Sequence, residues 1–213
     1  MVKRLLLHVS LAAAALVVVP AALASGGNYA FDGGTKAEQS QVTAALNASA
    51  FPWGIVPGPV VIHIKRGLDS SAAPNQIWLD ADLLDAGTFS WGVVQHEYAH
   101  QVDFALLGDA TRAQLHALLQ GTSWCGAEGH ANLDCERFAD LVAWSYWISP
   151  DNVMKPRDSQ DEGGQVSPAV FRAALAAFLP AAPSTAHLQL TPLAATRAPA
   201  SVTHAPTARH RKT

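Results

Sequence analysis

The sequence has only one long hydrophobic run, and that run lies at the N-terminus. Two basic residues precede the apolar residues 5–19, and a small-residue site, Ala-Leu-Ala, follows at 22–24. This order is typical of a secretory signal peptide, residues 1–24, cleaved before Ser25. An uncleaved anchor is the alternative, although a membrane span needs about 20 apolar residues. No later segment of the sequence is apolar enough to cross a bilayer, so we expect a secreted protein without stable membrane insertion after cleavage.

Basic side chains are scarce in the body of the chain. Residues 25–180 carry 8 basic and 17 acidic side chains, a formal charge of −9, which argues against nucleic acid as a partner. The chain of 213 residues is long enough for one domain with a sizeable core and is short for two. Residues 181–213 contain four basic residues and no acid. Their Ala/Pro-rich composition has no hydrophobic period, which predicts a disordered basic tail.

Cysteine is scarce as well, because the chain contains two, Cys125 and Cys135. A cysteine-rich zinc site needs closely spaced pairs and a second pair, and neither is present. In an exported chain, two thiols normally oxidise. We therefore expect one disulfide, between Cys125 and Cys135, that closes a short loop.

The hydrophobic pattern predicts an α+β fold, with a small sheet ahead of several helices. Glycines in residues 25–35 predict a flexible leading segment. Runs rich in β-branched and aromatic residues predict strands at 60–65 and 77–79. The predicted helices cover residues 36–49, from about 88 or 90 to 107, 110–120, 133–148 and 168–179, and a polar loop covers 151–167.

The run His-Glu-Tyr-Ala-His at 96–100 combines two histidines and a glutamate within one predicted helix. Because positions four apart lie on the same helix face, His96 and His100 can both reach one metal ion. Glu97 lies one residue further round the helix, where it can act as a base towards a water on the metal. The alternative is an amphipathic helix that happens to carry two surface histidines, and the surrounding sequence has to decide.

A catalytic zinc site needs a third protein ligand. The metzincin pattern has a glycine three residues after the second histidine and the third ligand three residues after that glycine. Here these positions hold Asp103 and Leu106, so this pattern is excluded. A later predicted helix carries Glu136 and Asp140 on one face. Two carboxylates on a buried helix need a partner, which a metal with its histidines would supply. The alternative is a surface salt bridge involving Arg137.

The two motifs together, His-Glu-x-x-His at 96–100 and Glu-Arg-Phe-Ala-Asp at 136–140, resemble those of the gluzincin group of zinc metallopeptidases. The short body and the Gln-Val-Asp run at 101–103 are similar to catalytic domains of the anthrax-lethal-factor type. The resemblance covers roughly residues 77–148. It implies a zincin-like fold, with a small twisted sheet whose edge strand, here 77–79, lines the substrate cleft beside the active-site helix.

The resemblance also implies residue roles. One Zn²⁺ ion would be held by His96, His100 and Glu136, and Glu97 would be the general base in hydrolysis by a zinc-bound water. Asp140 would steady a histidine ligand from outside the metal's coordination sphere.

Other roles are less well defined by the sequence. Asp103 is a candidate to hydrogen-bond a ligand histidine or the loop that follows, with a solvated or capping role as the alternative. The family's transition-state tyrosine has no clear counterpart. Tyr146 and His130 are therefore both candidates to stabilise an oxyanion, with structural roles as the alternatives. The disulfide at Cys135 either fixes where the third ligand enters the site or only stabilises the domain.

The function expected from these features is that of a secreted, monomeric zinc metallopeptidase with a peptide or protein substrate. One alternative is a hydrolase of another amide, such as cell-wall peptide. Another is an inactive binding protein on a zincin scaffold, and the presence of Glu97 counts against this reading.

Overall fold

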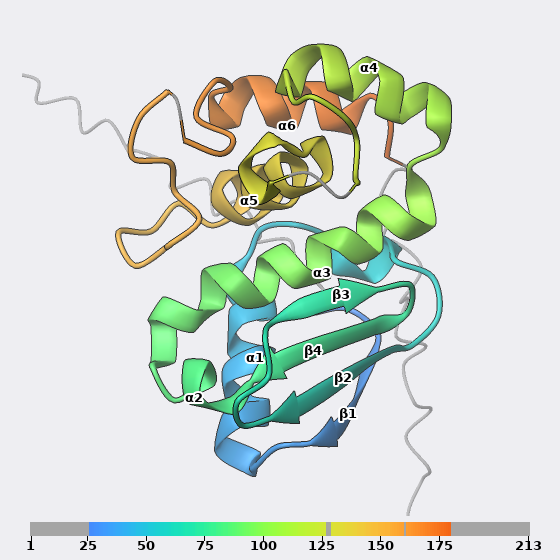
Figure 1. The fold of residues 1–213 in the computed structure, drawn as a ribbon. Helices are drawn as coiled ribbons and strands as arrows, with labels where there is room; N and C mark the ends of the chain where they lie inside the picture. Colours follow the sequence, from blue (N-terminus) through green and yellow to red (C-terminus); the bar gives the residue numbers. More distant parts are fainter. Residues whose placement is uncertain (1–25, 127–128, 160, 180–213) are drawn as a thin grey trace, which may run out of the picture. The chain divides into compact units, whose positions relative to one another are not determined.

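The structure is a computed structural model that describes residues 26–126, 129–159 and 161–179. Within these ranges the chain forms six α-helices and a mixed sheet of four strands, so the predicted α+β class is confirmed (Figure 1). None of the helices described is both long and apolar enough to cross a bilayer. The expected leader, residues 1–24, and the expected tail, residues 181–213, lie outside the described residues.

The described chain opens with one strand and one α-helix, continues with three strands, and is helical from the middle onward. The predicted helices and both predicted strands are present, with boundaries shifted by a few residues. In chain order the elements are β1 (Tyr29–Gly33), α1 (Lys36–Ala48), η1 (Trp53–Ile55), β2 (Val60–Lys65), β3 (Ser71–Ala73), β4 (Gln76–Asp80), α2 (Ala81–Leu84), η2 (Gly87–Ser90), α3 (Trp91–Leu106), α4 (Asp109–Leu119), η3 (His130–Asn132), α5 (Asp134–Tyr146) and α6 (Pro168–Ala176).

The strand order in the sheet is β1-β2-β4-β3, so the prediction that residues 77–79 form the edge strand is wrong. Ile77 in β4 pairs in parallel with Ile62 of β2 and antiparallel with Ala72 of β3. The edge strand beside the helices is β3, whose Ser-Ala-Ala sequence has no β-branched residue to mark it. It forms because Asn75, at φ 63°, reverses the chain into a tight hairpin.

The leading segment is also more ordered than predicted, because β1 lies within it. Its register aligns Tyr29 with Val60 of β2, and the Tyr29 hydroxyl donates to Thr43 Oγ1 at 3.1 Å. Gly33 and Gly34 adopt φ values of 83° and 72°, in the left-handed region that favours glycine. These two glycines therefore end a strand, whereas the sequence pattern suggested that they loosen the chain.

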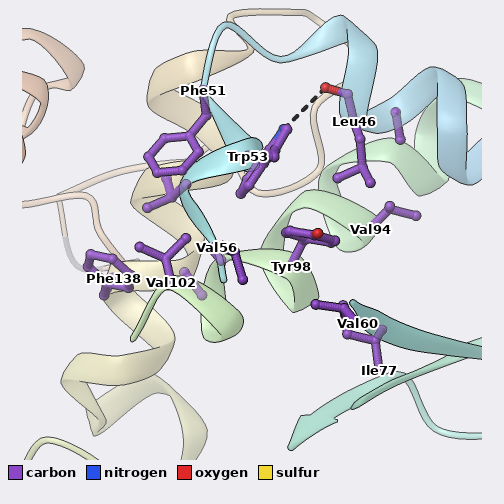
Figure 2. Close-up of a cluster of buried hydrophobic side chains, with 14 of the residues drawn as sticks. Leu46, Phe51, Trp53, Val56, Val60, Ile77, Val94, Tyr98, Val102 and Phe138 are labelled. Carbon is purple, nitrogen blue, oxygen red and sulfur yellow. Dashed lines mark hydrogen bonds between the residues drawn. The ribbon is translucent and has the colours of Figure 1, made fainter. Parts of the chain in front are cut away.

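The core lies between the sheet and the helices α1 and α3. Alternate residues of β2 are buried, as expected for a strand with one face on the core. Val60 and Ile77 from the sheet lie close to Val94 and Tyr98 from α3 (Figure 2). Trp53 is fully buried in the same cluster.

Helix α3 lies between the sheet on one side and α5 on the other (Figure 1). Its polar side chains are therefore buried as well as its apolar ones, and they need partners. Gln95 Nε2 donates to Ala45 O of α1 at 2.8 Å, and Gln101 Nε2 donates to Ala73 O of β3 at 2.9 Å. These bonds fix α3 against α1 and the edge strand.

Candidate metal centre

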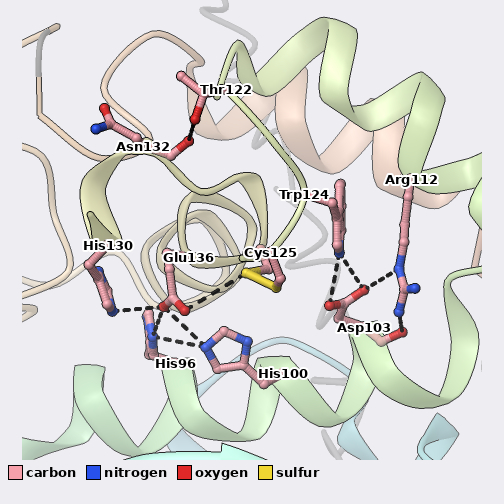
Figure 3. The surroundings of a disulfide bond; sticks show 11 residues. His96, His100, Asp103, Arg112, Thr122, Trp124, Cys125, His130, Asn132 and Glu136 are labelled. Carbon is pink, nitrogen blue, oxygen red and sulfur yellow. Dashed lines mark hydrogen bonds and ion pairs between the residues drawn. A yellow bond between two sulfur atoms is a disulfide. The ribbon is translucent and has the colours of Figure 1, made fainter. Parts of the chain in front are cut away.

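The candidate centre forms where α3 and α5 face each other (Figure 3). His96, Glu97 and His100 come from two adjacent turns of α3, and all three are buried. Glu136 comes from the first turn of α5, and Asp140 follows one turn later. The residues of both sequence motifs therefore meet at one place.

Three donor atoms converge there with nearly equal separations. Glu136 Oε2 lies 3.2 Å from His96 Nε2 and 3.3 Å from His100 Nε2, and the two Nε2 atoms lie 3.2 Å apart. A tetrahedral zinc ion bonded at about 2.0–2.1 Å holds its donors about 3.3–3.4 Å apart. Two imidazoles and one carboxylate with this spacing fit one zinc ion that has a further position open.

The other ring nitrogen of His96 is held by Asp140. Its Nδ1–H donates to Asp140 Oδ1 at 2.7 Å, a partner that assigns the tautomer and leaves Nε2 to face the centre. Burial by itself lowers the pKa of His96, but hydrogen bonds with Asp140 and Glu136 outweigh burial and raise this pKa to about 10. Burial by itself raises the pKa of Glu136, and hydrogen bonds from His100 and His96 hold it well below its usual range. The carboxylates therefore create an environment that favours a cation.

Glu97 lies beside the donors. One of its carboxylate oxygens lies within 4.8 Å of a ring nitrogen of His96 and of His100. Burial raises the pKa of Glu97, and the two nearby histidines oppose the rise. A buried carboxylate with a raised pKa suits proton transfer.

His130 lies at the mouth of the centre, with its side chain 62% exposed. Its Nε2 lies 2.8 Å from Glu136 Oε2, and its ring stacks on that of His96 with centroids 6.0 Å apart. The 2.8 Å separation is too short for two donors on one tetrahedral zinc ion and suits a hydrogen bond donated by His130. His130 is therefore better placed as a donor beside the centre than as a ligand.

Two cavities meet at the centre and share the side chains of Ser70, His96, Glu97 and His130. The larger, about 950 Å³, extends from α3 to residues 150, 152–157, 161 and 162. The smaller, about 290 Å³, extends along β3. The two cavities adjoin as one cleft at these four shared residues, and all three candidate donors line the smaller one.

Asp103 and Tyr146 lie away from the donors. Asp103 accepts hydrogen bonds from Arg112 Nε at 2.9 Å and Trp124 Nε1 at 3.0 Å, so it holds the following helix and loop and not a ligand histidine. Tyr146 packs against Phe51 at the end of α5, with ring centroids 5.0 Å apart, and burial raises its pKa. Tyr146 is not among the described residues that line either cavity. Of the two oxyanion candidates, His130 alone faces the cleft.

The predicted disulfide between Cys125 and Cys135 is confirmed. It connects the loop after α4 to the first turn of α5, directly before Glu136. The backbone N–H groups of Asp134 and Cys135 also donate to Ser123 O and Trp124 O, at 2.9 and 2.7 Å. The start of α5 is thus held by the disulfide and by two backbone hydrogen bonds.

Glu162 was not identified from the sequence, which predicted only a polar loop around it. Its side chain lines the larger cavity, and its Oε1 lies 3.2 Å from His130 Nδ1. Burial and the neighbouring carboxylate of Asp140 raise the pKa of Glu162. Nothing in the local sequence marks this residue, because the contact depends on how the loop folds back over α5.

Comparison of the chain with protein-family models, with curated proteins and with solved structures gave no match. The interpretation of the centre therefore depends on its residues and their geometry.

Proposed function

We propose that this chain is an exported zinc metallopeptidase of the gluzincin type, with a zincin-like fold. In this proposal His96, His100 and Glu136 bind one zinc ion, and Glu97 is the general base. One observation carries the proposal: the three donor atoms lie 3.2–3.3 Å from one another, the spacing of a tetrahedral zinc site. Since Glu136 lies 40 positions after His96, local helix geometry alone does not explain this convergence.

The side chains around the donors have distinct tasks in peptide hydrolysis. Zinc bound here would supply Lewis acidity, which polarises a carbonyl and makes water a stronger acid. Glu97 takes a proton from the attacking water and transfers it to the leaving amine. Asp140 holds His96 in the tautomer that presents Nε2. His130 turns its Nε2–H from Glu136 Oε2, the oxygen proposed to bind zinc, to the carbonyl oxygen as that oxygen gains negative charge.

The cleft suits an extended peptide as substrate. β3 is hydrogen-bonded to β4 on one side, and its Ala73 O already accepts from Gln101 Nε2, so we expect a peptide strand to pair with the part of β3 before Ala73. Ser71 and Ala72 of β3 line the smaller cavity together with His100. A peptide paired along β3 therefore passes over the donors, and the larger cavity receives the side chains beyond the scissile bond.

The test compares zinc content and casein hydrolysis of the purified protein with those of Glu97→Gln and Glu136→Gln variants. We expect wild type to hold one zinc ion and to cleave casein. Glu97→Gln keeps the zinc but loses cleavage, because only the base is removed. Glu136→Gln binds zinc more weakly, because a donor is changed.

A matched pair of histidine variants controls for loss of folding. His100→Ala removes a donor, whereas His63→Ala removes a half-buried histidine that lies on the sheet, bonded to Asp32. We expect His63→Ala to keep both zinc and cleavage. Wild type without zinc refutes the proposal, and Glu97-dependent hydrolysis of cell-wall peptide in place of casein changes the substrate class but not the residue roles.

A further inference from the structure

The disulfide forms part of the wall of the candidate metal centre. Cys125 lines the smaller cavity together with His100 and Glu136. Cys135 Sγ lies 3.8 Å from Glu136 Oε1, which is a van der Waals contact, because a disulfide sulfur carries no proton to donate (Figure 3). Two sulfur atoms that can each become a zinc ligand therefore lie beside a set of three converging donors.

The backbone of Cys125 is held at this place by bonds that do not involve sulfur. Asp134 N and Cys135 N donate to Ser123 O and Trp124 O on the two residues before it. The indole of Trp124 also donates to the buried carboxylate of Asp103 at 3.0 Å. Opening the disulfide would therefore leave Cys125 at the edge of the cavity, with its side chain free to turn.

We propose that reduction of the disulfide makes Cys125 a fourth protein ligand of the zinc ion. This inference rests on the proposed function, since it requires the zinc site of His96, His100 and Glu136. Catalytic zinc sites keep one position open for water or substrate, whereas sites with four protein ligands are closed. The reduced chain is then a zinc-bound but latent form, and oxidation to the disulfide opens the site.

The chemistry of the switch balances with a phosphine as reductant. The phosphine takes one oxygen from water and becomes a phosphine oxide, the S–S bond breaks, and the two hydrogens of that water protonate the two sulfurs. When Cys125 binds zinc as a thiolate, its proton is released to solvent. In the reverse direction, a disulfide reagent accepts the two electrons, and the protein disulfide forms again.

The geometry assigns the ligand role to Cys125 and not to Cys135. Cys135 is 1% exposed, lies within the first turn of α5 and is not among the described residues that line the smaller cavity. Cys125 is exposed, lines that cavity and is followed by Gly126, so its side chain has both room and freedom to reach the donors.

Cobalt substitution tests the proposal, because a thiolate bound to Co²⁺ gives a charge-transfer absorption in the near ultraviolet that imidazole and carboxylate ligands lack. The proteins are oxidised wild type, phosphine-reduced wild type, Cys135→Ser, Cys125→Ser and the double serine variant, kept under argon. We expect the band in reduced wild type and in Cys135→Ser, and not in the other three. Since changes outside the coordination sphere already alter metal affinity by about 10–100-fold, we expect Cys135→Ser to bind zinc at least ~10-fold more tightly than the double variant.

The outcomes separate this inference from the proposed function. If oxidised wild type binds no Co²⁺, the metal centre itself is refuted. If it binds Co²⁺ but neither reduced wild type nor Cys135→Ser develops the band, the centre stands and the switch is refuted. A band in Cys125→Ser that matches that of Cys135→Ser overturns the assignment to Cys125. Reduced wild type keeps the test valid if a serine variant does not fold.

Discussion

Replacing Asp140 by asparagine tests how the centre holds its first histidine. The carboxylate accepts a 2.7 Å hydrogen bond from His96 Nδ1, and both side chains are almost fully buried. Asparagine has nearly the same shape and can still accept this bond, but as a neutral amide. The change therefore removes the charge of the partner and leaves the packing in place.

The size of the effect follows from the exchange of a charged hydrogen-bond acceptor for a neutral one. A hydrogen bond to a charged group contributes about 1.5–3 kcal/mol and a neutral one about 0.5–1.5 kcal/mol, so the change costs about 1–1.5 kcal/mol. That corresponds to about tenfold in a dissociation constant. It lies at the lower end of the roughly 10–100-fold range for carboxylates behind ligand histidines. The lower end is expected because Asp140 also raises the pKa of His96 and so stabilises the proton that zinc must displace. Losing the Asp140 charge therefore weakens both the bound and the unbound state.

The assay is competition for zinc against a chelating dye at fixed pH and ionic strength. Asp134→Asn is a matched control, because Asp134 is also buried on α5 and bonded to a histidine, His116, which lines a different cavity. We expect Asp140→Asn to weaken zinc binding about tenfold and Asp134→Asn to leave it unchanged. Equal zinc affinities for wild type and Asp140→Asn would refute the reasoning, since His96 would then need no carboxylate behind it.

Three further predictions concern stability. Removing zinc with a chelator should lower the melting temperature by about 5–10 °C, because zinc at 100 times its dissociation constant stabilises the fold by about 2.7 kcal/mol; an unchanged melting temperature would contradict zinc binding to the folded state. Trp53→Ala should lower the free energy of unfolding by about 3–5 kcal/mol in denaturant titrations, because the side chain is fully buried and its indole donates to Leu46 O. Gly27→Ala should cost about 1–3 kcal/mol, since φ is +84° and a Cβ would lie 2.5 Å from Tyr98 Oη; Gly58→Ala, at φ +74° with no atom nearby, is the control and should cost less.

The five longer helices and the two candidate metal-binding motifs could be predicted because their information is local, whereas the short helix α2 was not predicted. The spacing of His96 and His100 fixes a helix face, and the spacing of Glu136 and Asp140 fixes another. The hydrophobic residues beside these motifs require both helix faces to be buried, and packing the two faces against each other buries both. The distance of 3.2 Å between His96 Nε2 and Glu136 Oε2 agrees with that expectation.

The remaining features could not be predicted because they depend on contacts distant in sequence. β1 is recognisable only once β2 is available as its partner, and β3 only once Asn75 has turned the chain back on β4. His130 comes from the short η3 and Glu162 from a loop, and both side chains are placed by the helices on which these segments rest. Spacing predicted a face for Asp103 but not its partners, Arg112 and Trp124, which come from the following helix and loop.

The buried polar residues of α3 fall into two groups, and the difference between the groups locates the functional site. Gln95, Gln101 and Asp103 each bond to another part of the chain, so their burial is satisfied by the fold itself. His96 and His100 also bond to side chains of α5, but their Nε2 atoms converge on one carboxylate oxygen, Glu136 Oε2, and on each other. Burying such groups is costly unless something binds them together. A cation at this common focus would satisfy all three donors at once, and the proposed zinc site rests on this convergence.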